Sequence, residues 1–174
     1  RIARRQRQMC IRDRVNLDTC NEALPQKQKD LGLAIKQSNL CSEITLPTDE
    51  ERTAVCCLSS VNLEHFDKWS KDKNFINDLV TMLDNVLQHF IDNAVDTTQL
   101  GEYNANFKRF TKHIRAGKEG FTKATYSAYR ERSIGLGAMG FHAYLQSKQI
   151  PFESIYASGF NHKAFKHIKT KALE

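Results

Sequence analysis

Three side chains that could do chemistry stand at alternate positions of one short segment, at Asn39, Cys41 and Glu43. In an extended chain alternate side chains point to the same face, so the spacing predicts that an amide, a thiol and a carboxyl converge. These groups supply a hydrogen-bonding partner, a nucleophilic or one-electron sulfur, and a proton acceptor. The spacing leaves a simpler interpretation open, a half-buried strand in which the cysteine is a small apolar side chain.

A second cysteine segment follows, in which Cys56 and Cys57 are adjacent. Residues 54–61 are small or apolar and carry no charge, which predicts a buried strand. Alternation along that strand places Cys56 and Leu58 on one face and Cys57 on the other. Only one of the two adjacent cysteines can therefore face Cys41.

Apolar residues at three- and four-residue spacing predict helices further along the chain. The clearest begins after Asn74, a candidate N-cap, and its apolar face holds Ile76, Leu79, Val80, Leu83, Val86, Leu87, Phe90, Ile91 and Ala94. A second amphipathic helix is predicted from Ser158, with an inner face of Asn161, Phe165, Ile168 and Ala172. Residues 15–34 predict a loop with at most one short helix. Residues 35–46 predict an extended chain that turns around Cys41.

The segment Gly135–Gly140 spells G-x-G-x-x-G, the pattern of dinucleotide-binding turns. That pattern binds a pyrophosphate only where a buried strand leads into the first glycine and a helix follows. Here the charged triplet Arg130, Glu131 and Arg132 comes just before it, so no such strand is expected. We predict instead a small-residue helix over 134–147, in which the glycines let another backbone approach closely.

Three blocks of sequence resemble the large, catalytic subunit of class I aerobic ribonucleoside-diphosphate reductases, above all the T-even bacteriophage type. The blocks are QSNLCSEITLPTDE (37–50), TAVCCLSSVNL (53–63) and RERSIGLGAMGFHAYLQSK (130–148). They follow the order of the family, and the resemblance extends over most of residues 35–174. It implies an α/β fold, namely a fragment of the family's ten-stranded α/β barrel, mostly helical in this piece with a few strands around the cysteine loop.

The resemblance also implies a role for each site residue. Cys41 would form the transient thiyl radical that removes the ribose 3′ hydrogen, Glu43 would accept the proton of the 3′ hydroxyl, and Asn39 would hydrogen-bond the ribose. Cys56 would be one half of the dithiol that reduces the 2′ position, with its partner cysteine upstream of this sequence. The substrate would be bound by the loop itself, through Ser38, Asn39, Leu40, Cys41 and Glu43.

Partners and setting follow from the same resemblance. The substrate would be a ribonucleoside diphosphate, and the radical would come from a small subunit with a di-iron tyrosyl centre. Thioredoxin or glutaredoxin would re-reduce the disulfide, and two large subunits would form a homodimer. ATP and dNTP effectors would bind regions outside this sequence. We expect no cofactor or metal in the chain itself, and a cytoplasmic setting in a bacterium or a phage-infected bacterial cell.

Charge and cysteine spacing restrict the other possibilities. The 174 residues carry a net charge of +6, and residues 1–14 alone hold six arginines and one aspartate. The sequence RRQRQMCIRDR in this segment resembles a translated sequencing adapter, so we treat residues 1–14 as non-native and exclude them from fold reasoning. Family subunits are several times longer, so residues 15–174 are expected to be a partial catalytic barrel domain. Metal-ligand spacing and membrane-length apolar runs are missing from the sequence.

Residues 97–121 do not fit the family pattern, and we expect them to be an insertion. They interleave basic residues with aromatic ones, including Tyr103, Phe107 and Phe110. Such a mixture could bind single-stranded nucleic acid by stacking and charge. The simpler interpretation is a solvated surface excursion.

Two functions of other classes stay open at the level of sequence. One is a basic nucleic-acid-binding module built from residues 1–14 and 103–118, whose phosphate contacts would give a steep salt dependence. The other is an unrelated cysteine-dependent enzyme, in which Cys41 would be activated by a histidine such as His142. The sequence offers no family signature for this enzyme.

Overall fold

The computed structural model describes residues 16–39, 42–96 and 110–174. In this part of the chain, strands β1 (Cys57–Asn62) and β2 (Ile134–Met139) pair in parallel. The other described elements are α2 (Leu17–Glu22), α3 (Gln26–Asp30), η1 (Leu63–His65), α4 (Phe66–Trp69), α5 (Phe75–Ala94), η3 (Thr111–His113), η4 (Glu119–Phe121), α7 (Thr122–Glu131), α8 (Phe141–Ser147) and α9 (Ile155–Ala172). The predicted α/β class, with helices predominating, is confirmed.

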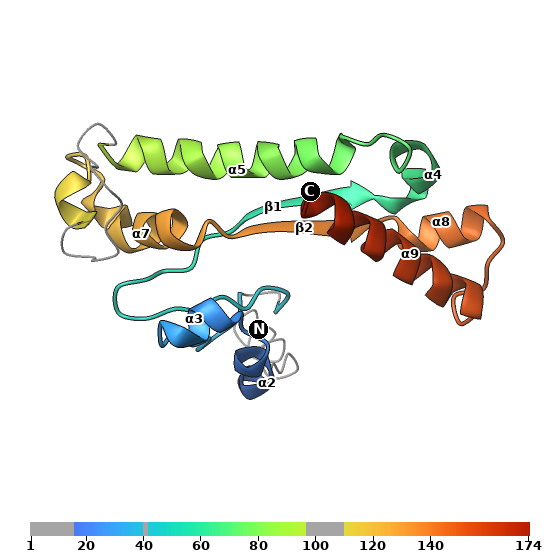
Figure 1. The fold of residues 1–174 in the computed structure, drawn as a ribbon, viewed down its shortest axis with the longest axis horizontal. Coiled ribbons are helices and arrows are strands. Elements are labelled where there is room, and N and C mark those ends of the chain that lie inside the picture. The colour runs from blue at the N-terminus through green and yellow to red at the C-terminus, as the bar shows by residue number, and fades with distance from the viewer. Residues whose placement is uncertain (1–15, 40–41, 97–109) are drawn as a thin grey trace, which may run out of the picture.

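Helix α5 covers one face of the two strands. Figure 1 shows α5 along one side of β1 and β2, with α2 and α3 on the other side. The face toward α5 carries Cys57, Val61 and Ile134, which belong to apolar clusters that α5 shares. Leu58 and Met139 point to the opposite face and are exposed in the described part of the chain. A strand is therefore confirmed within the predicted range, from Cys57 onward, but it is not buried on both faces as predicted, because Leu58 is 56% exposed.

The long helix α5 forms where the apolar periodicity predicted it. Its buried residues are Ile76, Leu83, Leu87, Ile91 and Ala94. Two details of the prediction are wrong. Asn74 stands at the N-cap but makes no side-chain capping bond, and Val86 is 52% exposed. The N-terminal segment also differs, because two short helices rather than one lie between Asn16 and Leu31.

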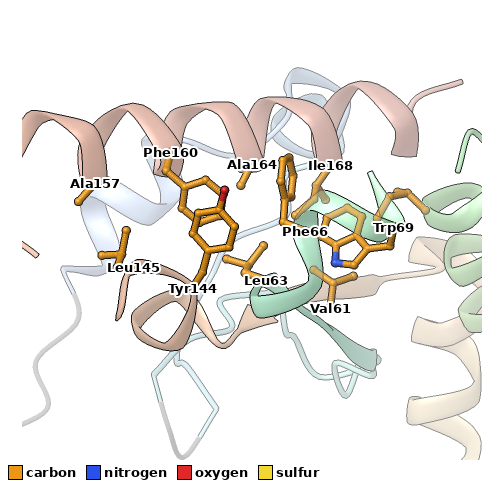
Figure 2. Close-up of a cluster of buried hydrophobic side chains, with 11 residues drawn as sticks. Val61, Leu63, Phe66, Trp69, Tyr144, Leu145, Ala157, Phe160, Ala164 and Ile168 are labelled. Atoms are coloured by element: carbon orange, nitrogen blue, oxygen red, sulfur yellow. The ribbon is translucent and has the colours of Figure 1, made fainter. Parts of the chain in front are cut away.

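An aromatic cluster joins the far end of β1 to α4, α8 and α9 (Figure 2). The Tyr144 and Phe160 rings stack with centroids 3.7 Å apart, and Phe66 meets Trp69 edge-on at 4.9 Å. The Trp69 indole donates a 2.8 Å hydrogen bond to the Asn62 carbonyl. These contacts bury the ends of four elements together, so β1 is held firmly at its carboxyl end.

Helix α9 confirms the predicted C-terminal helix but presents a different face. It begins at Ile155, where Ser154 caps it by accepting a hydrogen bond from the Ala157 amide. Its buried residues are Ala157, Phe160, Ala164 and Ile168, as Figure 2 shows. Phe165, predicted to face inward, is 45% exposed. Ala157 and Ala164 lie on the buried face because their small side chains let α9 approach the aromatic cluster closely.

The helix predicted over 134–147 is wrong in its first half, where β2 lies instead. Gly135 stands opposite Leu58 in the ladder, and a Cβ on Gly135 would lie 2.6 Å from Leu58 Cδ2. The glycine therefore makes room for a side chain of β1, and pairing with β1 decides the local structure. The expectation that no strand stands at the glycines is also wrong, because Gly135 and Gly137 lie in β2 itself, between α7 and α8. That the glycines do not bind a dinucleotide stays a prediction.

The described end of the 97–121 segment is a solvated excursion only in part, because residues 115–121 are exposed whereas Phe110 is buried. Phe110 is 2% exposed, and its ring lies 5.3 Å from that of Tyr126 and 5.6 Å from that of Tyr129. Ile114 forms an antiparallel bridge with Val95 at the end of α5. Residues 97–109, including Tyr103 and Phe107, lie outside the described residues. Whether the segment is an insertion stays a prediction.

Candidate active site around the cysteine loop

The cysteine loop, residues 39–44, is closed at its base by hydrogen bonds between Asn39 and Ile44. The Asn39 amide donates to the Ile44 carbonyl at 3.1 Å, and the Ile44 amide donates to Asn39 Oδ1 at 3.0 Å. The Ser42 amide donates to the Asn39 carbonyl, and Ser42 has a left-handed φ of 64°. The turn predicted around Cys41 is therefore confirmed at Ser42, and it breaks the extended conformation on which the alternation argument rested.

Two of the three chemical groups nevertheless converge. The Asn39 side-chain amide donates a 2.5 Å hydrogen bond to Glu43 Oε1. This convergence comes from the turn rather than from strand alternation. Leu40 and Cys41 lie outside the described residues, so the position of the third group, the thiol, and its distance from His142 stay predictions.

A cavity of about 700 Å³ opens beside the loop. Its wall comes from residues 36–39 before the loop, residues 44–50 after it, and residues 52–58 leading into β1. Ser38 and Asn39 line it, and Ser38 donates a 3.0 Å hydrogen bond to the Asn39 carbonyl. A volume of this size is within the range of about 300–1,000 Å³ usual for small-molecule sites.

Of the two adjacent cysteines, Cys56 lines this cavity. Cys57 packs on the other face, against the cluster that contains Leu87 and Ile91. Burial raises the pKa of the Cys56 thiol, and the neighbouring Cys57 raises it further. The structure thus places Ser38, Asn39 and Cys56 around one cavity. Glu43 is exposed and does not line this cavity, although Asn39 donates a hydrogen bond to it.

Sequence reasoning missed two contributors to this site. Gly135 lies beneath Cys56, and a Cβ on Gly135 would be 3.6 Å from Cys56 Sγ. Arg52 lines the cavity and lies 3.2 Å from the Glu131 carboxylate, at the centre of the charged triplet before the glycines. The charged triplet 130–132 is visible in the sequence, but no local pattern in the sequence indicates that its Glu131 pairs with Arg52.

Residues 16–39, 42–96 and 110–174 contain no group of three or more His, Cys, Asp or Glu side chains that could hold a metal ion. Among the helices of the same segments, none is long and apolar enough to cross a membrane. These findings concern the described residues alone.

Comparison with known proteins identifies the family. Residues 14–174 match the family model described as "Ribonucleotide reductase, barrel domain". The chain is 51% identical over 154 residues to the ribonucleoside-diphosphate reductase large subunit of Invertebrate iridescent virus 3, covering 88% of this chain and 21% of that protein. It is 45% identical over 157 residues to a putative large subunit of Frog virus 3, covering 90% of this chain and 24% of that protein.

A solved structure agrees with these sequence matches. The class Id ribonucleotide reductase alpha subunit of Actinobacillus ureae superposes with a TM-score of 0.67 and 33% identity, covering 90% of this chain and 26% of that one. None of these three relatives is a bacteriophage protein, so the T-even affinity stays a prediction. Neither the nucleic-acid-binding module nor the unrelated cysteine enzyme gains support. The chain belongs to the ribonucleotide reductase family, as part of the barrel domain of the large subunit.

Proposed function

We propose that this chain forms the cysteine-loop part of the active site of a ribonucleoside-diphosphate reductase. The complete subunit would convert ribonucleoside diphosphates to 2′-deoxyribonucleoside diphosphates for DNA synthesis by a thiyl-radical mechanism. One observation carries the proposal: Asn39 holds the Glu43 carboxylate and lines the cavity that Cys56 also lines. The names of the relatives supply the reaction class.

The loop residues start the reaction in this proposal. Cys41, as a thiyl radical, removes the hydrogen atom from C3′ of the ribose. Glu43 accepts the proton of the 3′ hydroxyl, and Asn39 orients both the carboxylate and the sugar by hydrogen bonds. The substrate is bound by Ser38, Asn39, Leu40, Cys41 and Glu43. A closed cavity protects the radical from water and from stray reductants.

Cys56 completes the reaction together with a second cysteine from another part of the subunit. The 2′ hydroxyl is protonated and leaves as water, and the dithiol supplies the two electrons and two protons that the sugar needs. The two sulfurs end as a disulfide, and Cys41 returns its hydrogen to C3′. A raised thiol pKa suits Cys56 to this role, because the protonated thiol is the hydrogen donor.

The remaining assignments concern partners outside this chain. A small subunit with a di-iron tyrosyl centre would generate the radical and pass it to Cys41. Thioredoxin or glutaredoxin would reduce the disulfide that contains Cys56. Large subunits would act as a homodimer in the cytoplasm of a bacterium or a phage-infected cell, with ATP and dNTP effectors bound elsewhere in the subunit. The redox roles of both cysteines are consistent with a reducing compartment.

The test is a reductase assay on the full-length subunit that contains this sequence. The subunit is mixed with the small subunit encoded in the same genome, dithiothreitol and each of the four common ribonucleoside diphosphates. We expect a 2′-deoxynucleoside diphosphate that forms only when the small subunit is present. Absence of a deoxy product with all four substrates, with both subunits folded and the radical present, would contradict the proposal.

A further inference from the structure

The charged triplet at the end of α7 joins two other parts of the fold. Arg132 donates hydrogen bonds to Asp84 Oδ1 of α5, at 2.7 Å from Nη2 and 3.0 Å from Nε. It also donates a 2.6 Å bond to Gln88 Oε1. Glu131 points the other way and meets Arg52, which lies just before Cys56. One end of α7 therefore holds both the covering helix and the cysteine segment.

Arg52 is enclosed by three partners. Its Nη1 donates a 2.8 Å hydrogen bond to Asp49 Oδ2, and its Nε lies 3.2 Å from Glu131 Oε1. Its guanidinium lies 5.3 Å from the ring centroid of Tyr126 on α7. The Arg52 and Glu131 side chains are only 13% and 9% exposed. Ser127 donates a 2.6 Å hydrogen bond to the other Glu131 oxygen. Arg52 Nε makes no hydrogen bond within the described residues, so it acts on the carboxylate by charge alone.

The Arg52–Glu131 pair lies between the cysteine loop and Cys56. Asp49 and Arg52 both line the cavity, as do Asn39 and Cys56. Beyond Arg52 the chain follows α7, because the Thr53 amide donates to the Lys123 carbonyl at 3.3 Å. The Arg52–Glu131 pair therefore holds the segment between the cysteine loop and Cys56 against α7.

A contribution to stability alone explains this arrangement poorly. A buried ion pair loses hydration energy that its attraction often fails to recover, whereas it does fix geometry. Burial raises the pKa of Glu131 even with Arg52 beside it, so the carboxylate carries a desolvation cost. Burial also acts to lower the pKa of Arg52, but the charges of Glu131 and Asp49 outweigh it and raise that pKa, so cost and attraction largely offset each other across the pair. A role in fixing the cysteine loop relative to Cys56 explains better why the pair is kept despite its desolvation cost.

We propose that Arg52 and Glu131 are positioning residues, which set the width of the cavity between the cysteine loop and Cys56 without contacting the reacting atoms. The expected effect of the pair on turnover rests on the proposed function above. The expected effect on the position of Cys56 does not depend on that function.

The first experiment measures Cys56 directly and needs no activity. In the full-length subunit, the rate of Cys56 alkylation by iodoacetamide is followed by peptide mass spectrometry. Variants are Arg52→Gln, Glu131→Gln and the double variant, with Asp84→Asn as matched control, since it weakens the other ion pair of α7. We expect alkylation about tenfold faster in both single variants and in the double, as for a local opening easier by about 1.4 kcal/mol. The Asp84→Asn rate should equal that of wild type.

The double variant distinguishes an effect on the position of Cys56 from an effect of charge on its thiolate. It has the net charge of wild type, so a purely electrostatic effect on the thiolate would largely cancel in it, whereas a lost position would persist. A double variant as fast as the faster single variant shows that the two residues act as one unit. Rates that multiply, a return to the wild-type rate, or equal acceleration in Asp84→Asn would each overturn the proposal.

The second experiment measures turnover by the complete reductase. Positioning predicts that kcat falls about tenfold in Arg52→Gln, Glu131→Gln and the double, while KM for the nucleotide stays within about twofold. Asp84→Asn should keep the wild-type kcat. A rise of KM alone in Arg52→Gln would mean that Arg52 binds substrate and would overturn the positioning role. If wild type itself forms no deoxy product, the proposed function fails, and the alkylation rates still decide the role of the pair.

Discussion

The side chain of Asn39 donates a 2.5 Å hydrogen bond to Glu43 and accepts one of 3.0 Å from the Ile44 amide. One residue thus closes the cysteine loop and aims its carboxylate. Because the same side chain also lines the cavity, any change at Asn39 alters loop closure and carboxylate position together. This coupling makes Asn39 the best place to begin testing the site.

Asn39→Ala should lower deoxynucleotide formation about ten- to a hundredfold, because a hydrogen bond to a charged group is worth about 1.5–3 kcal/mol. The measurement is kcat in the reconstituted reductase. Asn93→Ala is the matched control, since Asn93 is exposed on α5 and, among the described residues, its side chain donates to His89. Wild-type kcat in the Asn39 variant would show that the loop does not need this bond.

The two adjacent cysteines should behave differently on substitution. Cys56 lines the cavity and Cys57 packs in the core, so Cys56→Ser should stop multiple turnover with thioredoxin as reductant, whereas Cys57→Ser should keep it. The measurement is the amount of deoxynucleotide formed per subunit. Multiple turnover in Cys56→Ser, together with its loss in Cys57→Ser, would exchange the two assignments.

The raised pKa of Cys56 predicts its reactivity as a function of pH. Thiolates are the form that alkylating agents attack, so a raised pKa delays the reaction to higher pH. The midpoint of the Cys56 alkylation rate against pH should lie above that of the same cysteine in urea-unfolded protein. Equal midpoints, or a lower one in the folded protein, would show that the cavity does not disfavour the thiolate.

Asp67 offers a pH test away from the site. The hydrogen bond and charge of Lys148, 2.8 Å away, lower the pKa of Asp67, and a bond from Tyr144 adds to this effect. A lowered pKa stabilises the fold above the ordinary Asp pKa, and this contribution is lost as the pH falls through the lowered value. Lys148→Met should raise the Asp67 pKa, measured by NMR titration. Tyr144→Phe should raise it less, and the reverse order would contradict the assignment.

Local sequence patterns correctly predicted some elements of the structure and not others. Apolar periodicity predicted α5 because its inner face packs into two apolar clusters, one shared with α9 and one shared with α7. The spacing of Asn39 and Glu43 predicted their convergence, although the structure achieves it by a turn at Ser42. Cys56 was chosen over Cys57 by resemblance, and the structure places Cys56 in the cavity wall.

Two of the errors have the same physical cause, which is contact between segments distant in sequence. The glycines at 135 and 137 favour neither helix nor strand strongly, and pairing with β1 decides for a strand. Phe110 was predicted to be exposed from its basic neighbours, but a pocket between Tyr126 and Tyr129 buries it. Tertiary contacts of this kind leave no periodic trace in the sequence.

The most direct test of the account is Cys41→Ser in the full-length subunit, assayed with the small subunit and a ribonucleoside diphosphate. The account predicts that deoxynucleotide formation ceases while the Kd for the substrate stays close to wild type, because serine keeps the shape of the loop but cannot carry the radical. Continued formation of the deoxynucleotide by this variant would contradict the central claim.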